Sequence, residues 1–292
     1  MPDPKVTVLI PNYKTLLLTK LCLRLLRKHT DLQKVHVIVI DNDSQDESLD
    51  YLRSLKWIEL IERKKALDDT PSLSHSRALD LALERVTTPY VFSIHTDTLF
   101  KDPRWLDVLL TEIEKEPVVA GVGSWKLEKK PSFMKRLGKA IEYQRRIGYC
   151  RLIGKTDKAK DIENQRQSGY YRLIGKTDIT SEGKGKDYYY LRSHCALYRM
   201  DLIEKMNLRF SDGAETAGKV MHKKLVDKGY KMVFLPSEFL GRYVVHLNHA
   251  TAVLHPELGS RKKTIRKGLK RFKKELEALN AGQILKDNSL DY

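Results

Sequence analysis

Three apolar segments near the start of the chain each end in a cluster of polar or acidic side chains. They read VTVLIPNYK at 6–14, VIVIDNDSQDES at 37–48 and SIHTDTLFKDPRWL at 93–106. Buried parallel strands read as near-continuous apolar runs, and the groups that follow such strands meet at the carboxyl edge of the sheet, where α/β proteins bind ligands. The order of these segments therefore predicts a parallel sheet with a ligand site along one edge.

Strand and helix patterns alternate along the first half of the chain. Apolar runs predict strands at Val6–Ile10, Val35–Ile40, Trp57–Ile61 and Tyr90–Ile94, and apolar stripes predict helices at Leu16–Lys28, Ser72–Arg85 and Pro103–Glu114. Repeated βα units predict a doubly wound, mostly parallel sheet with flanking helices. Beyond it we expect strands at Tyr188–Tyr198, Lys231–Leu235 and Tyr243–Leu247 and helices at Ala214–Asp227 and Pro256–Asn280.

A basic stretch separates the two halves. Residues 126–192 contain 18 basic and 8 acidic side chains, and they supply +10 of the net charge of +16. Within them GYCRLIGKTD at 148–157 recurs as GYYRLIGKTD at 169–178. Because two copies are too few for a solenoid, we expect an insertion that contains a duplicated hairpin or loop.

The excess of positive charge indicates an anionic partner: a nucleotide diphosphate, lipid headgroups or nucleic acid. No recognisable nucleic-acid module supports the third. The cysteines, Cys22, Cys150 and Cys195, form no CxxC pair, so neither a disulfide framework nor a zinc site is indicated, and a reducing cytoplasm fits best. No signal peptide and no apolar run near the ~20 residues that span a bilayer are recognisable. We therefore expect a cytoplasmic protein, soluble or peripheral at the inner face of the membrane.

The blocks at 6–14, 37–48 and 93–106 resemble the nucleotide-sugar domain of inverting family 2 glycosyltransferases. This resemblance implies an α/β GT-A (Rossmann-like) fold, a nucleotide-sugar donor, Mn²⁺ or Mg²⁺, and a glycan or lipid-linked acceptor of the cell-surface polysaccharide type. We accordingly expect a nucleotide-sugar-binding half at 1–125, a basic insertion at 126–189, an acceptor-side half of the same domain at 190–255 and a basic C-terminal amphipathic helix in a tail at 256–292.

The donor site implied by the resemblance begins at the ends of the first two strands. There the family pattern brings Pro11, Asn12 and Tyr13 against the nucleotide and lets Asp41 contact the base, with Asp43 beside it. Carboxylates at such strand ends can accept hydrogen bonds from a base or a ribose. The alternatives are that Asn42 and Asp43 form an Asx turn and cap the next helix, and that Tyr13 is a packing residue.

A partial match follows at 72–91, SLSHSRALDLALERVTTPYV, which resembles the family's G-x-x-x-A-R-N-x-G element beside the donor. Arg77 is kept, Ser or His replaces the usual glycines, and Asp80 stands where Asn is common. Near the start of a helix, Arg77 could meet a diphosphate with help from the helix dipole. The alternative is a surface salt bridge.

The segment HTDT at 95–98 resembles the family's Asp-x-Asp motif, and Pro103, Trp105 and Leu106 match its D-P-x-W-L continuation. The resemblance makes Asp97 a ligand of a divalent cation, which would neutralise charge on the departing diphosphate. His95 replaces the first Asp, and with Thr96 it is expected on the donor side. Imidazole suits Mn²⁺ better than Mg²⁺. The alternative is that Asp97 is a turn acceptor before the next helix.

The segment FSDGAETAGKVMHKKLVDKGYKMVFLP at 210–236 resembles the family's acceptor-side element. An inverting transfer needs a base to take the proton of the attacking hydroxyl. Glu215 is the candidate base and Asp212 the second choice; the alternative is that either acid only stabilises the N-terminus of the following helix.

Two histidines follow a late strand in RYVVHLNHATAV at 242–253. Many GT-A enzymes supply a late histidine to the metal or the diphosphate, and His246 matches that position better than His249. The alternative for both is a structural role. Zinc is disfavoured because there is no thiolate partner and no HExxH pattern.

The tail carries an apolar stripe of Ile265, Leu269, Phe272, Leu276 and Leu279. Nine of the 14 residues at 261–274 are Lys or Arg, so the segment 261–279 is a candidate contact for an anionic membrane surface. The alternative is that the stripe packs on the domain.

The leading interpretation of the whole chain is a metal-dependent, inverting glycosyltransferase. One alternative is a catalytically silent relative that binds nucleotides or glycans, because His95 departs from the motif. A nucleic-acid-binding protein, suggested by charge alone, is the less favoured class.

Overall fold

The computed structural model describes residues 3–125, 133–160, 162–163, 188–214, 216–247, 269 and 273–292. It divides into two compact units, one formed by residues 1–128 and 190–292 and the other by residues 129–189. The second unit falls within the basic insertion expected from the sequence. The two units are considered separately below.

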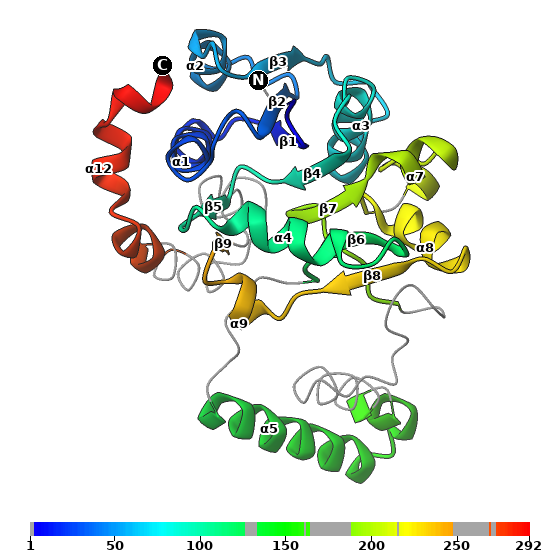
Figure 1. Ribbon diagram of the computed structural model, residues 1–292. Coiled ribbons are helices and arrows are strands. Elements are labelled where there is room, and N and C mark those ends of the chain that lie inside the picture. The colour runs from blue at the N-terminus through cyan, green and yellow to red at the C-terminus, as the bar shows by residue number, and fades with distance from the viewer. Residues whose placement is uncertain are drawn as a thin grey trace. The chain divides into compact units, whose positions relative to one another are not determined.

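A seven-stranded sheet forms the centre of the first unit, in the order β3-β2-β1-β4-β7-β6-β8 (Figure 1). Its strands are β1 (Val6–Asn12), β2 (Val35–Asp41), β3 (Glu59–Glu62), β4 (Tyr90–Ile94), β6 (Val119–Gly123), β7 (Cys195–Arg199) and β8 (Lys231–Phe234). Strand β7 runs antiparallel to β4 and β6, and the other pairs are parallel. The predicted α/β fold with a mostly parallel sheet and flanking helices is confirmed.

Strand register brings the ends of β1, β2 and β4 together. Asn12 pairs with Asp41 at the carboxyl ends of β1 and β2, and β4 runs parallel to β1 on its other side. A second, two-stranded sheet pairs β5 (Thr98–Phe100) with β9 (Val244–His246), with Thr98 opposite His246. This pairing places His246, a residue late in the sequence, close to the residues that follow β4.

Helices cover both faces of the large sheet. They are α1 (Leu16–Lys28), α2 (Glu47–Ser54), α3 (Pro71–Leu83), α4 (Trp105–Glu114), α7 (Met200–Lys205), α8 (Lys219–Asp227), α9 (Ser237–Leu240) and α12 (Ala281–Lys286), with 3₁₀ turns η1 (Asp212–Ala214) and η3 (Asn288–Asp291). Because side chains alternate along a strand, Val8 and Ile10 of β1 join a core with α1 and α4, whereas Leu9 joins a second core with α3 and α8. The apolar runs of the sequence are thus buried from two sides.

Strand β6 and the short β5 were not expected from the sequence. Strand β6 reads VAGVG and is buried throughout. A Cβ at Gly123 would lie 2.2 Å from the carbonyl oxygen of Cys195, so glycine is required where β6 and β7 approach. Such a close approach depends on the partner strand, which a local pattern does not reveal.

Two predicted elements begin later than expected. The strand predicted at Tyr188–Tyr198 is wrong over its first part, because a turn in which Cys195 N donates to Arg192 O delays β7 until Cys195. The helix predicted at Ala214–Asp227 begins at Lys219, because Gly218 before it is left-handed, with φ of 74°. Both differences create turns beside the sheet.

The described part of the tail is folded onto the first unit. Leu276 and Leu279 pack against the core that contains α1, which supports the packing alternative for this half of the apolar stripe. Helix α12 and η3 follow, and Arg24 of α1 forms two hydrogen bonds of 2.8 and 2.5 Å to the carboxylate of Asp291. The rest of the helix predicted at Pro256–Asn280, apart from residue 269 and residues 273–280, lies outside the described residues.

In the second unit, helix α5 (Phe133–Leu152) leads into a turn with Gly154 at φ of 73° and a helical segment at 156–160. Of the expected hairpin or loop, the first RLIGKTD copy therefore forms no hairpin of strands but a helix end, a turn and the start of the next helical segment. The second copy, at 169–178, lies outside the described residues. No helix in the described ranges is long and apolar enough to cross a membrane.

Candidate functional site

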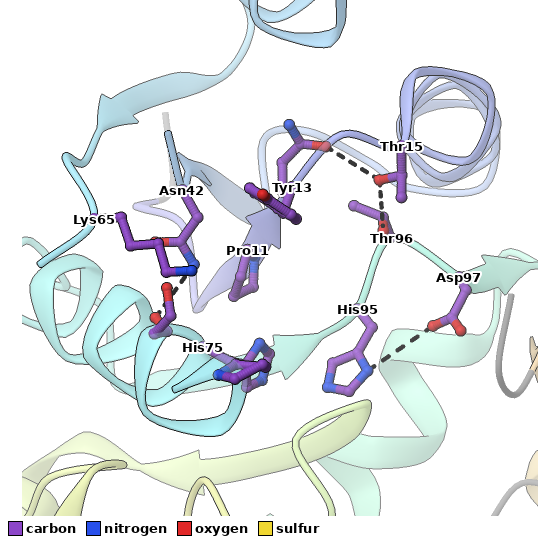
Figure 2. A pocket seen from close by; sticks show the side chains of 12 residues that line it. Pro11, Tyr13, Thr15, Asn42, Lys65, His75, His95, Thr96 and Asp97 are labelled. Atoms are coloured by element: carbon purple, nitrogen blue, oxygen red, sulfur yellow. Dashed lines mark hydrogen bonds and ion pairs between the residues drawn. The ribbon is translucent and has the colours of Figure 1, made fainter. Parts of the chain in front are cut away.

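A cavity of about 240 Å³ opens at the carboxyl edge of the large sheet (Figure 2). Six of the residues expected at the donor and metal sites line it: Pro11, Asn12, Tyr13, His95, Thr96 and Asp97. Tyr13 is 42% exposed, so it is not a core packing residue. The ends of β1 and β4 supply these groups, as expected for a sheet of this topology.

Asn12 and Asp41 are hydrogen-bonded to each other at this edge of the sheet. Asn12 Nδ2 donates to Asp41 Oδ1 at 2.7 Å, and Ser44 donates to the same carboxylate from its hydroxyl (2.5 Å) and its backbone N–H (2.9 Å). Both Asn12 and Asp41 are 1% exposed, and Asp41 does not line the cavity. Its carboxylate fixes the loop after β2, and its contact with a base stays a prediction.

The residues beside Asp41 take roles different from the expected turn and cap. Asp46, rather than Asn42 or Asp43, caps α2 by accepting from Ser48 N. Asp43 has a positive φ of 65° and accepts a hydrogen bond of 2.8 Å from Gln45 Nε2, outside the cavity lining. A role for Asp43 in donor binding stays a prediction.

Asn42 lines the cavity and is held from two sides. Its Oδ1 accepts from Arg63 Nη1 at 2.8 Å, and its Nδ2 donates to the carbonyl of Ser74 at 3.2 Å. Lys65, Ser74 and His75 complete this wall, and the sequence analysis did not select them. Lys65 is in a loop and His75 is near the start of a helix. Polar residues are common at such positions, so they indicate a site only once the topology brings them to the cavity.

Arg77 is paired with two aspartates. Its guanidinium donates to Asp68 Oδ1 at 2.9 Å and to Asp69 Oδ1 at 2.6 Å, and Asp69 also accepts from Arg63. The side chain of Asp69 is fully buried, so its bonds with Arg63 and Arg77 stabilise the loop between β3 and α3. Arg77 does not line the cavity. The salt-bridge alternative describes its contacts in the structure, and its diphosphate role stays a prediction.

Asp97, His95 and His246 form a candidate metal centre whose ligand atoms all lie within 4.8 Å of one another. His246 Nε2 is 3.1 Å and His95 Nδ1 is 3.9 Å from Asp97 Oδ1. Asp97 follows β4, while the pairing of β5 with β9 delivers His246. A carboxylate with two imidazoles is a donor set that suits Mn²⁺.

Two atoms of this centre are buried without a hydrogen-bond partner among the described residues: Asp97 Oδ1 and His246 Nδ1. The contact between Asp97 and His246 has an ion-pair distance but not the geometry of a hydrogen bond. Buried polar atoms are normally satisfied. The orphaned Asp97 Oδ1 therefore fits a site that is completed by a bound cation, whereas His246 Nδ1 is on the side of its ring away from the nitrogen near Asp97.

Burial and neighbouring charges set the protonation of the cluster. Burial lowers the pKa of His75 to about 4, and burial together with His75 places the pKa of His95 well below its usual value. Burial alone would raise the pKa of Asp97, but attraction to His246 and His95 outweighs it and lowers that pKa. At neutral pH His75 and His95 are therefore neutral and Asp97 is ionised, the forms in which imidazole and carboxylate bind metals.

Further polar groups surround the centre from the turn before β7. The ring of His194 stacks on His246 with centroids 4.1 Å apart and planes 8° apart, and Ser193 hydrogen-bonds to both His75 and His95. Sequence reasoning missed this pair because it assigned residues 188–198 to a strand. Two adjacent polar residues, Ser193 and His194, before an apolar strand were the available signal.

The candidate bases lie in the segment before α8. Asp212 is paired with Lys224 at 2.9 Å and is 19% exposed in its side chain, and it is not among the residues that line the cavity. Asp80 accepts from the backbone N–H groups of Phe210 and Ser211 and ties this segment to α3. Glu215 lies outside the described residues. The choice between the two acids stays a prediction.

Comparison with known proteins gives a family and a fold. The model of the family described as Glycosyl transferase family 2 matches residues 7–206. Similar solved structures include a mannosyltransferase, PcManGT from Pyrobaculum calidifontis in complex with GDP-Man and Mn²⁺ (18% identity, TM-score 0.51), and residues 1–349 of S. aureus TarS (13% identity, TM-score 0.50). No curated protein matches the sequence significantly.

These two matches cover 81% and 83% of this chain but 56% and 60% of the neighbours' chains. The chain thus spans less than two thirds of the length of each neighbour. At such low identity the likeness shows the fold alone, and that fold is the GT-A arrangement of the sheet and its flanking helices.

Proposed function

Because the chain belongs to glycosyl transferase family 2, we propose that it transfers a sugar from a nucleotide-diphosphate donor to a hydroxyl of a glycan or lipid-linked acceptor. The observation that carries this proposal is the centre of Asp97, His95 and His246 beside the cavity at the carboxyl edge. The neighbour solved with GDP-Man and Mn²⁺ has the same fold, which supports a nucleotide-sugar donor and a divalent cation here.

In this proposal the cavity binds the donor and its walls orient it. Tyr13 and Asn42 both line the cavity, and Lys65 is an exposed cation in the same lining, where an ammonium group can meet phosphate oxygens. Asn42 keeps a fixed orientation because Arg63 and Ser74 hold both ends of its amide. A rigid wall of this kind lowers the cost of positioning the reacting groups.

Asp97, His95 and His246 would hold the divalent cation, with Mn²⁺ favoured over Mg²⁺ by the two imidazoles. When bound, such a cation neutralises negative charge on a departing diphosphate. Asp97 is buried, and attraction to the neighbouring histidines holds the pKa of its carboxyl below the ordinary value.

We further propose an inverting transfer with a carboxylate base, for which Glu215 is preferred and Asp212 is the second choice. Glu215→Gln is expected to lower the transfer rate by about 10²- to 10⁴-fold, the usual contribution of a general base, with little effect on donor affinity. Asp212→Asn is expected to lower the rate less than tenfold, because its carboxylate already pairs with Lys224.

The measurement is release of nucleoside diphosphate from a panel of UDP, GDP and dTDP sugars with Mn²⁺ and candidate acceptors. Loss in Asp212→Asn with full activity in Glu215→Gln would reverse the assignment. Donor binding without turnover of any donor by the parent chain would favour the catalytically silent relative.

We also propose that the basic tail at 261–279 contacts an anionic membrane surface. Leu269 is exposed, and each basic residue near anionic headgroups contributes about 1 kcal/mol, although Leu276 and Leu279 are turned toward the core. The test is flotation with vesicles in which about three in ten lipids are anionic phosphatidylglycerol, a composition that gives the surface a strong negative potential. The parent chain is expected to float with these vesicles. Replacing the basic residues at 261–271 by Gln should abolish flotation; unchanged flotation would reject the proposal.

A further inference from the structure

The hydroxyl of Ser193 lies between two imidazoles. Its Oγ is 3.0 Å from His95 Nε2 and 3.1 Å from His75 Nε2, and the rings of these histidines meet edge to face with centroids 4.7 Å apart. A serine hydroxyl has one proton to donate. If both imidazoles are neutral, one Nε2 must therefore accept that proton while the other donates its own N–H to Oγ.

The position of His95 decides between the two arrangements. Its other nitrogen, Nδ1, is the one directed at Asp97, at 3.9 Å (Figure 2). A ligating nitrogen needs a free lone pair, so a ring that binds a cation beside Asp97 through Nδ1 must carry its proton on Nε2. His95 Nε2–H then donates to Ser193 Oγ, and Ser193 Oγ–H donates to His75 Nε2.

We propose that Ser193, with His75 as the acceptor of its hydroxyl proton, is a positioning residue that holds His95 in the tautomer and ring orientation whose free Nδ1 faces Asp97. This inference rests on the cation site of the proposed function. Ser193 is buried, and His95, which is partly exposed to the cavity, is also flanked by the rings of His194 and His246 at 6.0 and 5.8 Å.

The Ser193 hydroxyl affects cation binding because it fixes the orientation of the His95 ring. Without the hydroxyl, neither the rotation of the His95 ring nor the location of its proton is fixed by a partner on the Nε2 side. Groups that orient a metal-binding histidine in this way typically contribute about 10- to 100-fold to metal affinity.

The first test measures Mn²⁺ affinity from the electron paramagnetic resonance signal of the free ion, without donor or acceptor. Ser193→Ala is expected to weaken binding by about 10- to 100-fold. Ser193→Thr keeps the hydroxyl and should restore most of the affinity. Ser76→Ala is the matched control, because Ser76 is also buried but bonds to backbone carbonyls of α3; it should bind Mn²⁺ as the parent does. Equal affinity in Ser193→Ala and the parent would overturn the proposal.

A second measurement reads the tautomers in the metal-free chain. Long-range ¹H–¹⁵N spectra of histidine-labelled protein, assigned with His95→Gln and His75→Gln, are expected to show His95 protonated at Nε2 and His75 protonated at Nδ1. The opposite pattern would overturn the proposal whatever the Mn²⁺ result. If the parent chain shows the expected tautomers but binds no Mn²⁺, the result would support the positioning of His95 by Ser193 and reject the cation site.

Discussion

Asp97→Asn is expected to lower kcat/KM for sugar transfer by roughly 10³-fold and to abolish measurable Mn²⁺ binding. The substitution keeps the shape of the side chain but removes the negative charge beside His246 and His95. A divalent cation contributes several kcal/mol to stabilising a charged leaving group, and each 1.36 kcal/mol or so is a factor of ten in rate. No other residue of the proposed centre supplies an anion.

The measurement is initial rates of nucleoside diphosphate release with saturating Mn²⁺, alongside circular dichroism to show that the fold is kept. Asp50→Asn is the matched control, since Asp50 is an exposed carboxylate on α2, and it should leave the rate unchanged. Parental activity in Asp97→Asn would mean that Asp97 only stabilises the turn after β4.

Arg24→Ala is expected to destabilise the first unit by about 3–5 kcal/mol, the usual result of breaking a buried ion pair. The Arg24 side chain is 2% exposed. Besides the two bonds to Asp291, it donates to Asn288 Oδ1 at 2.8 Å and to the carbonyls of Ile284 and Leu285 at 3.1 and 2.6 Å. The variant therefore leaves a partly buried carboxylate and several acceptors without their donor.

Urea unfolding of the full chain, followed by tryptophan fluorescence, measures this effect. Arg53→Ala is the control: Arg53 makes a similar two-bond contact with Glu62, but both side chains are about half exposed, so this variant should lose far less stability than Arg24→Ala. Equal stability of the two variants would show that the C-terminal helices contribute little to the folded unit.

The same contact has a pH signature. Burial alone would raise the pKa of Asp291, but hydrogen bonds from Arg24 and Tyr51 hold it below its ordinary value. Because the folded-state pKa is the lower one, this stabilisation is complete above the unfolded aspartate pKa of about 4 and is lost as the pH falls through the folded value. The stability difference between the parent and Arg24→Ala should therefore shrink in acid.

The sequence predicted the parts of the fold that depend on local pattern. Helix α1 and strand β4 have the bounds expected for Leu16–Lys28 and Tyr90–Ile94, because a leucine stripe and a short apolar run bounded by turns suffice to specify them. Strand β6 was missed because its glycines make sense only next to β7. The start of β7 was misplaced because a turn, not a side-chain pattern, sets it.

In the candidate site, too, the sequence predicted residues that follow a local pattern and missed residues that tertiary contacts bring together. Asp97 was selected from its place after a strand and from a motif resemblance, and the structure brings it next to His246 through the pairing of β5 with β9. Ser193 and His75 were missed because their meeting depends on the turn before β7 and on α3. Arg77 was selected for a ligand, yet Asp68 and Asp69, nine and eight residues earlier, engage its guanidinium.

A crystal structure of the chain with Mn²⁺ and a nucleoside diphosphate, with the ion located by its anomalous signal, tests the central claim most directly. We expect one manganese peak within bonding distance of Asp97, His95 and His246, and a phosphoryl oxygen of the nucleotide on the same ion. A nucleotide bound in the cavity with no ion at these three side chains, or with the ion held elsewhere, would contradict the account.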